Sequence, residues 1–312
     1  MEEIGNSQNG EDPSGSSPFF WTDEVLMEGQ LVQQLVNGLL IGFMYSLIAI
    51  GLTLIWGVMN IVNFAHGDFL MLGMFTSFWL YTLYGLDPLF SIPICTVLLF
   101  VLGVLIYRFI VSKVMRGPVL AQLVVTFGVS IFLANLAVFL WTPDFRLIEK
   151  PLLRGTWEIG QIELSIPKLM ASIGSVLTSI FVFWFLKKTR IGKAILATEM
   201  DREAALLMGI NTERINSISF AIGSSLVGIA GAFLSTYYYI YPQVGGVFGT
   251  IAFAIVALGG FGSIEGAFLA GILVGLVQTL GGYFFDPAYK YAIVFLIYLI
   301  TVWIRPRGLL GW

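Results

Sequence analysis

The densest group of side chains able to do chemistry lies in residues 60–68, at the start of an apolar segment. Asn63, His66 and Asp68 bring an amide, an imidazole and a carboxyl group together there. A histidine beside an aspartate can act as a general base with its orienting partner. The i, i+2 spacing of His66 and Asp68 does not place them on one helix face, and no nucleophile is marked. The pattern therefore argues against a catalytic pair.

The sequence lacks the residues for a cysteine-based or histidine-rich metal site and for nucleotide hydrolysis. His66 is the only histidine and Cys95 the only cysteine, which excludes a cysteine-based metal site, a histidine-rich metal or haem site and an intrachain disulfide. The Walker A pattern is absent, because Gly192-Lys193-Ala194 lacks both the upstream glycine and the hydroxyl residue. If the protein uses ATP, the ATPase is another polypeptide.

The loop at residues 187–215 is polar and long enough to fold locally. Its residues 193–208 combine good helix formers with both charge signs, which predicts short amphipathic helices at a surface. Asn211 and Thr212 are candidate caps of the next helix, since their side-chain oxygens can accept hydrogen bonds from its first amides.

One helix surface within this loop is small enough for another protein to pack against. Glu203 stands beside the small pair Ala204 and Ala205. Gly209 is expected to end the helix, because glycine tolerates the left-handed conformation of a helix cap. On these residues alone, a partner surface and a simple solvated loop between two membrane segments both remain open.

The composition places most of the chain in lipid. Hydrophobic residues make up 57% of the sequence and charged residues 11%, against about 25% charged residues in soluble domains. A water-soluble fold could not cover itself with so few charges, so the bilayer is the natural solvent for the excess apolar surface. The net charge is -3 and no basic patch is present, which argues against nucleic-acid binding.

Nine apolar segments follow one another and predict an all-α, polytopic membrane helical bundle of about 8–10 transmembrane segments. The segment at 247–261 is short and that at 61–83 contains polar residues, so either is a candidate for a broken or re-entrant helix. Three glycines in four residues, Gly259, Gly260 and Gly262, also predict a helix break, with a place in a translocation path as the alternative. The segments lie near residues 31–56, 61–83, 89–111, 120–141, 168–187, 215–239, 247–261, 265–285 and 290–304.

The N-terminus differs from the rest of the chain. Residues 1–30 are a polar, acidic tail, and residues 31–312 are the membrane domain. Seven of the nineteen acidic residues lie in the first 28 positions. Residues 1–22 lack the basic region of a secretory signal, and we interpret them as a disordered or interfacial segment or as a small cap over the first membrane helix.

The basic residues predict which end of the bundle faces the cytoplasm. Eleven of the sixteen lysines and arginines lie around residues 108–116, 187–214 and 305–307. Basic residues are enriched on the inner side of membrane proteins, so the loop at 187–215 and the C-terminus are expected to be cytoplasmic. Residues 142–167 are then an outside loop with short structure. Nine crossings would leave the acidic tail outside, and an even number would leave it inside.

The polar groups beside the membrane segments allow two interpretations. Ionisable groups are costly inside a bilayer and usually face a cavity, a partner or the interface. In one interpretation Asn63, His66 and Asp68 line a translocation path or shape a helix break. In the other, Asp68 caps a helix and His66 hydrogen-bonds a neighbouring loop. Glu265 is expected to cap the following helix, where free amides favour a carboxylate, with the permeation path as the alternative.

At Glu203, Ala204, Ala205 and Gly209 the loop resembles the permease signature of ABC importers, a Glu-Ala-Ala triplet followed by three residues and a glycine. In that family the loop is a coupling helix seated in a groove of the ATPase subunit. The resemblance therefore implies an ATPase-coupling role for these four residues.

The wider chain is similar to one branch of that family, the permease subunits of branched-chain amino-acid importers, particularly the H-type subunit. The likeness covers about residues 31–312. The family often has glutamate at the place of Asp68 and a small residue or proline at the place of Glu265, and these departures leave the substrate open. Four stretches carry the resemblance: residues 37–51, 63–68, 207–212 and 258–266.

The resemblance implies a type II-like ABC importer permease in the plasma (inner) membrane of a prokaryote. The implied partners are a second permease subunit, two ABC ATPase subunits that hold ATP and magnesium, an extracytoplasmic solute-binding protein and membrane lipid. This chain itself is expected to bind no cofactor. The expected function is ATP-driven import of branched-chain or related amino acids by alternating access. The alternatives are a similar urea or amide importer permease and an ATP-independent channel or secondary carrier.

Overall fold

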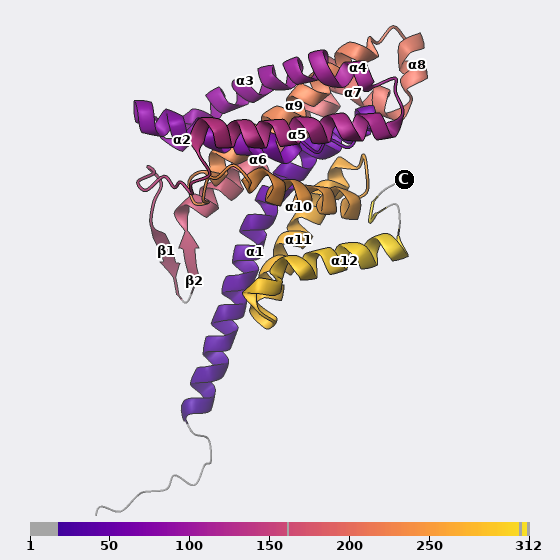
Figure 1. Cartoon of the computed structure of the whole chain (residues 1–312). Coiled ribbons are helices and arrows are strands. Elements are labelled where there is room, and N and C mark those ends of the chain that lie inside the picture. Colours follow the sequence, from indigo (N-terminus) through magenta and orange to yellow (C-terminus); the bar gives the residue numbers. More distant parts are fainter. Residues whose placement is uncertain (1–17, 161, 306–307, 311–312) are drawn as a thin grey trace, which may run out of the picture.

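The computed structural model describes residues 18–160, 162–305 and 308–310, and of residues 18–28 it describes only the helical backbone. The named secondary-structure elements of the described residues are helices and one hairpin, whose strands are β1 (Thr156–Ile159) and β2 (Ile162–Ser165) (Figure 1). The helices are α1 (Pro18–Met59), α2 (His66–Tyr84), α3 (Pro88–Ile106), the π-helical η1 (Tyr107–Val111), α4 (Ser112–Val114), α5 (Val119–Trp141), α6 (Ile166–Lys188), α7 (Arg190–Met200), α8 (Arg202–Leu207), α9 (Thr212–Leu234), α10 (Val244–Gly259), α11 (Ile264–Phe284), the 3-10 turn η2 (Pro287–Tyr289) and α12 (Lys290–Ile304).

Each of the nine predicted apolar segments forms a helix, which confirms the all-α membrane bundle. Seven helical spans in the described residues are long and apolar enough to cross a membrane. α2 and α10 fall outside that group, and α10 has only 16 residues. They are the two segments, 61–83 and 247–261, that the sequence marked as broken or re-entrant. The chain is therefore a multi-pass membrane protein in which α2 and α10 differ from the seven long apolar spans.

The first helix is longer than the sequence analysis expected. α1 begins at Pro18, so residues 18–22, assigned to a disordered or interfacial segment, are helical. The part of α1 that is apolar enough to span a membrane begins at Gly29. The rest of the predicted tail, residues 1–17, lies outside the described residues.

α1 is the central helix of the bundle. Its apolar window is 83% buried whereas that of the last span is 6% buried, so α1 is surrounded by protein and α12 lies at the rim. Glycines bring α1 and α11 together: a Cβ on Gly42 would lie 2.8 Å from Ile272 Cα, and one on Gly271 would lie 2.6 Å from Ser46 Cα. Such close packing holds helices together in lipid, where apolar surfaces are not driven together by water.

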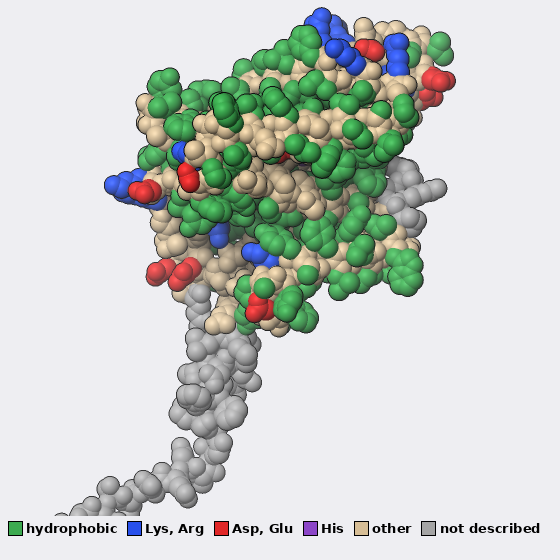
Figure 2. Space-filling view, viewed as in Figure 1, with side chains coloured by type: hydrophobic (Ala, Val, Ile, Leu, Met, Phe, Trp, Pro, Cys, Tyr) green, Lys and Arg blue, Asp and Glu red, His purple; other side chains and the backbone are tan. Residues whose placement is uncertain are grey.

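The surface is divided into an apolar belt and two charged ends. Hydrophobic side chains cover most of the visible face, and charges gather at the end that carries α7 and α8 and at the opposite end (Figure 2). Phe139 on α5 is 82% exposed and Trp303 on α12 is 87% exposed, as expected of side chains that face lipid. The β1–β2 hairpin lies at the end opposite α8 (Figure 1) and supplies the short structure predicted for residues 142–167.

Candidate functional site

The predicted surface loop folds as two short helices with side-chain caps. Thr189 precedes α7, and its Oγ1 accepts a hydrogen bond from the amide of Gly192 at 2.9 Å. Asp201 precedes α8, and its Oδ1 accepts from the amides of Glu203 and Ala204 at 2.9 and 3.0 Å. Caps of this kind stabilise a helix by about 1 kcal/mol each. They matter here because a six-residue helix is too short to be stable by itself.

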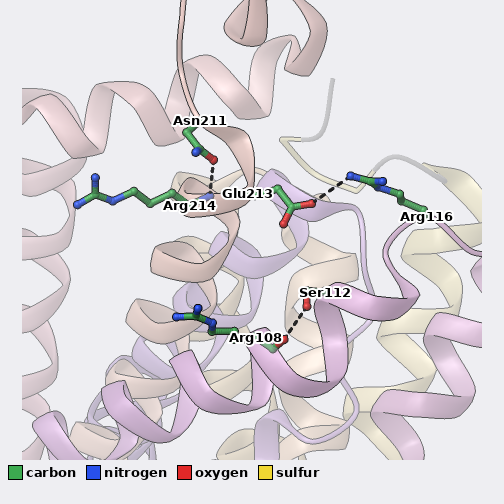
Figure 3. A network of polar contacts seen from close by, with 6 residues as sticks. All are labelled: Arg108, Ser112, Arg116, Asn211, Glu213 and Arg214. Atoms are coloured by element: carbon green, nitrogen blue, oxygen red, sulfur yellow. Dashed lines mark hydrogen bonds and ion pairs between the residues drawn. The ribbon is translucent and has the colours of Figure 1, made fainter.

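Gly209 ends α8, as predicted. Its φ of +81° lies in the left-handed region, and the amide of Ile210 donates to the carbonyl of Ala205 at 3.0 Å, which closes a Schellman-type cap. Asn211 then caps α9, because its Oδ1 accepts from the amide of Arg214 at 3.0 Å (Figure 3). The helix ends predicted from local sequence are therefore confirmed.

An ion pair holds the segment after α4 beside the start of α9. Arg116 lies 3.6 Å from Glu213, in the first turn of α9 (Figure 3). The two side chains are 91% and 58% exposed, so the pair contributes at most about 1 kcal/mol. Its effect is to position two neighbouring surface segments.

The side chains of α8 form an exposed and partly apolar surface. Glu203 and Ala204 are exposed, whereas Ala205 is only 4% exposed and packs against the bundle. Ala205 therefore adds nothing to the exposed surface of the helix, and an ATPase-coupling role for Glu203, Ala204, Ala205 and Gly209 stays a prediction. Leu207 and Met208 are 88% and 83% exposed and were missed, although an apolar run just before a capping glycine could have marked them. Apolar side chains exposed at a charged end of the molecule suit contact with another protein.

The second site lies at the connection between α1 and α2. α1 ends at Met59, residues 60–65 are not helical, and α2 begins at His66. His66 Nε2 donates a hydrogen bond to the carbonyl of Ile48 at 2.9 Å. Ile48 and Met59 are separated by about 16 Å along α1, or roughly half of the hydrocarbon thickness. The chain therefore turns back into the bundle before α2 begins, which confirms the predicted helix break.

The cap and the loop contact that the sequence suggested for this region are both wrong. The cap position of α2 is Ala65 and no side chain caps it, so Asp68 stands in the first turn without a capping hydrogen bond. His66 bonds to a carbonyl of helix α1 rather than to a loop, because the chain has re-entered the bundle. Asn63, His66 and Asp68 are all buried. Asn63 Nδ2 and Oδ1 have no hydrogen-bond partner in the described part of the chain, which is rare for buried polar atoms.

The short helix α10 begins against the first turn of α2. A Cβ on Gly67 would overlap the carbonyl oxygen of Gly245, and one on Gly249 would lie 3.5 Å from Gly67 Cα. The two backbones therefore touch inside the bundle, which only glycine permits. Neither Gly245 nor Gly249 was predicted as a site residue, although glycines three to four residues apart at the start of a short apolar segment were a usable signal.

A cavity of about 400 Å³ opens beside this crossing of α2 and α10. Phe64 forms part of its wall, with ring centroids 5.9 Å from Phe127 on α5 and 5.3 Å from Phe253 on α10. Ser130 and Tyr298 add hydroxyl groups from α5 and α12. Apolar walls with a few polar groups are typical of small-molecule sites. None of these lining residues was predicted, because they come together only in the fold.

A further break separates α10 from α11, as the glycines predicted. α10 ends at Gly259, and Gly260 and Gly262 have φ values of +105° and +83°, in the left-handed region. Ser263 then caps α11, since its Oγ accepts from the amide of Gly266 at 3.0 Å. The break is confirmed, and a place for these glycines in a translocation path stays a prediction.

Glu265 does not cap α11, because Ser263 fills that role. Glu265 lies in the first turn of the helix, where its charge is still favoured by the free amides. Its Oε1 is 3.2 Å from Nζ of Lys187, at the end of α6. The α10–α11 connection therefore lies beside the α6–α7 connection, at the end of the bundle that carries α8.

The chain is similar to known permease proteins. The family described as "Branched-chain amino acid transport system / permease component" matches residues 34–302. The permease proteins BraD of Pseudomonas aeruginosa and LivH of Escherichia coli, both named as high-affinity branched-chain amino acid transport system components, are each 32% identical over 90% of this chain and 95% of their own length. LivM of Escherichia coli, a permease protein with the same system name, is 28% identical over 85% of this chain and 67% of its own. No solved structure matches.

The match covers the bundle together with the α7–α8 surface and the α2–α10 crossing. The described residues also contain seven helical spans of membrane length. This chain is therefore the transmembrane part of a multi-component transporter. The chain belongs to the branched-chain amino acid transport permease family, and it is an H-type permease subunit of an ABC importer.

Proposed function

We propose that this chain and a second permease subunit enclose the path of an amino-acid importer in the inner membrane. Two ABC ATPase subunits, which hold ATP and magnesium, dock on the cytoplasmic side, and a solute-binding protein delivers the solute from outside. ATP binding closes the ATPase pair, and α7 and α8 pass that movement to the membrane helices. Likeness to both LivH and LivM supports a pair of related permeases.

The exposed surface of α8 is the observation that carries this proposal. Its helix is fixed by caps at both ends, so it can move as one unit. Leu207 and Met208 offer apolar contacts beside the charge of Glu203. Most lysines and arginines of the chain lie in the loops at this end, which supports a cytoplasmic position for α8 and the C-terminus.

The cavity supports an aliphatic amino acid as the solute. Phe64, Phe127 and Phe253 provide an apolar wall for a branched side chain, and the hydroxyl of Ser130 can hydrogen-bond a polar group. Urea has no apolar part and acetamide has only a methyl group, so neither would use such a wall as a branched side chain would. BraD and LivH, the similar proteins, are both named as branched-chain amino acid transport proteins, which supports the same solute.

The docking role is tested by reconstituting the chain with its partner subunits in vesicles. No atom lies near the position of a Cβ on Gly209, so Gly209→Trp adds bulk to the docking surface while distorting only the cap. We expect Gly209→Trp and Glu203→Lys to reduce ATP-dependent uptake by at least about tenfold, within the range of coupling between sites. Glu158→Lys on exposed β1 is the matched control and should be silent. Unchanged uptake in both α8 variants would refute the docking role.

The solute is tested by competition in the same vesicles. Leucine, isoleucine and valine should each inhibit uptake of labelled leucine, and urea and acetamide should not. ATP-dependent uptake of urea without uptake of leucine would replace the amino-acid proposal with the urea alternative. Uptake that persists without the ATPase subunits would instead show a channel or a secondary carrier.

A further inference from the structure

Glu199 is a charged side chain that reaches from the surface loop into the bundle. It is the next-to-last residue of α7 and is half-buried. A Cβ added to Gly57 would lie 2.6 Å from Glu199 Oε1 and 2.9 Å from its Cδ. A Cβ added to Gly262 would lie 3.3 Å from the same oxygen. The carboxyl group therefore fills a space that exists only because both neighbours are glycines.

The two glycines belong to different parts of the membrane domain. Gly57 lies in the last turn of α1, and Gly262 lies in the connection between α10 and α11. These two segments also touch directly, because the rings of Trp56 and Phe261 have centroids 4.5 Å apart. Glu199 thus joins α7 to the central helix and to the glycine-rich break at one point.

The electrostatics of this point are unusual for a surface helix. Burial, and to a smaller extent the charge of Glu265, raises the pKa of Glu199 to about 7. The charged group that acts on it is Glu265 at the start of α11, and Glu265 itself pairs with Lys187 at the end of α6 at 3.2 Å. In the described chain Glu199 has no ion pair or side-chain hydrogen bond of its own, so its neutral form suits the space between the glycines.

We propose that Glu199 is the positioning residue through which movement of the α7–α8 loop reaches α1 and the α10–α11 connection. The inference rests on the proposed docking of ATPase subunits at α8. When α7 moves, the carboxyl group pushes against backbone at Gly57 and Gly262, because neither position has a side chain that could yield. The neutral carboxyl stays seated between the glycines. The ionised carboxyl is drawn toward water, which loosens the contact.

The test measures uptake and ATP hydrolysis together in vesicles that hold the complete transporter, from pH 5.5 to 8.5. In the wild type, solute moved per ATP should fall as the pH rises through about 7, since Glu199 ionises there. Glu199→Gln keeps the neutral shape and should give a ratio that no longer changes with pH in this range. Glu199→Ala empties the space and should lower the ratio about tenfold at all pH values while ATP hydrolysis continues. Glu158→Ala is the matched control.

Two outcomes separate this inference from the proposed function. If ATPase subunits do not co-purify with the wild-type chain, the proposed docking fails. If they co-purify with the wild type and with Glu199→Ala, but all Glu199 variants keep the wild-type ratio and its pH profile, only the role of Glu199 is overturned.

A second variant approaches the same contact from α1. Gly57→Ala leaves Glu199 in place but displaces its carboxyl group, so the ratio of solute moved to ATP hydrolysed should fall severalfold. Gly128→Ala on α5 is the control, because a Cβ there meets no atom within 4 Å. Equal ratios for Gly57→Ala and the wild type would contradict a positioning role for the contact between Glu199 and Gly57.

Discussion

The α7–α8 loop and the α2–α10 crossing hold their residues in opposite ways. In the loop, helix ends are fixed by neighbours in sequence. For example, Asp201 Oδ1 accepts a hydrogen bond from the amide of Ala204 at 3.0 Å. In the crossing, the contacts join distant parts of the chain, as between Gly67 and Gly245. The loop has an exposed face, whereas the crossing is buried.

This difference separates two tasks within one permease subunit. Locally capped helices keep their shape when they move, which suits a surface that follows a partner. Two backbones in contact cannot move apart or closer together without a large cost in free energy. Such a contact suits the fixed framework around a cavity. Substitutions should therefore have the largest effect in the crossing, a smaller effect at the caps of the loop and the smallest effect at the surface ion pair.

The largest effect is expected at Gly67. Gly67→Ala places a Cβ against the carbonyl oxygen of Gly245, and backbone cannot yield as a flexible side chain would. Overpacking of this kind costs about 3 kcal/mol. We expect a clearly lower thermal midpoint of the purified chain and loss of uptake. Gly246→Ala, in the first turn of α10, meets open space and should leave the midpoint unchanged or slightly higher. Equal losses of thermal midpoint and uptake in Gly67→Ala and Gly246→Ala would contradict the role of the backbone contact at Gly67.

A smaller effect is expected at Gly209. The position has φ +81° and open space, so Gly209→Ala disturbs only the backbone conformation, at about 1 kcal/mol. A cost of about 1 kcal/mol corresponds to about a fivefold change, because 1.4 kcal/mol corresponds to tenfold, so uptake should fall about fivefold. Gly209→Asn should retain more uptake, because asparagine tolerates this conformation better. If the asparagine variant is as impaired as the alanine variant, the cap conformation is not what the position requires.

The smallest effect is expected at the ion pair between Arg116 and Glu213. A double-mutant cycle with Arg116→Ala and Glu213→Ala should give a coupling energy of about 0.2–1 kcal/mol that disappears in 1 M salt, because both groups are exposed. Thermal midpoints of the four proteins measure it. A coupling of several kcal/mol would show that this end of the bundle is as rigid as the crossing.

The parts of the candidate sites that could be predicted are those fixed by neighbours in sequence. The cap at Asn211, the helix end at Gly209 and the break at Gly260 follow from local backbone preferences, and the structure confirms them. The roles assigned to Asp68 and Glu265 as caps were wrong. Ser263, two residues before Glu265, holds that place with a shorter side chain that suits the hydrogen bond to the amide.

Contacts between distant segments could not be predicted from spacing. The sequence around His66 shows an ionisable group that is costly to bury in a membrane. It does not show that the hydrogen-bond partner of His66 is the carbonyl of Ile48, in another helix. The same holds for Glu199, which looks like an ordinary charge on a surface helix until Gly57 and Gly262 are brought to it. No local signal marks a side chain whose neighbours are two glycines from other elements.

The sequence by itself determined that the chain lies in a membrane, which segments are helices, where two of them break and which loop resembles a docking surface. Composition, segment length and local backbone preference are properties of short stretches, and they act before the chain is folded. Only the tertiary structure decided that α2 and α10 meet inside the bundle, that a cavity lies beside them and that Ala205 turns inward. Those features depend on how helices pack, and in lipid that packing is set by detailed shape rather than by a hydrophobic pattern.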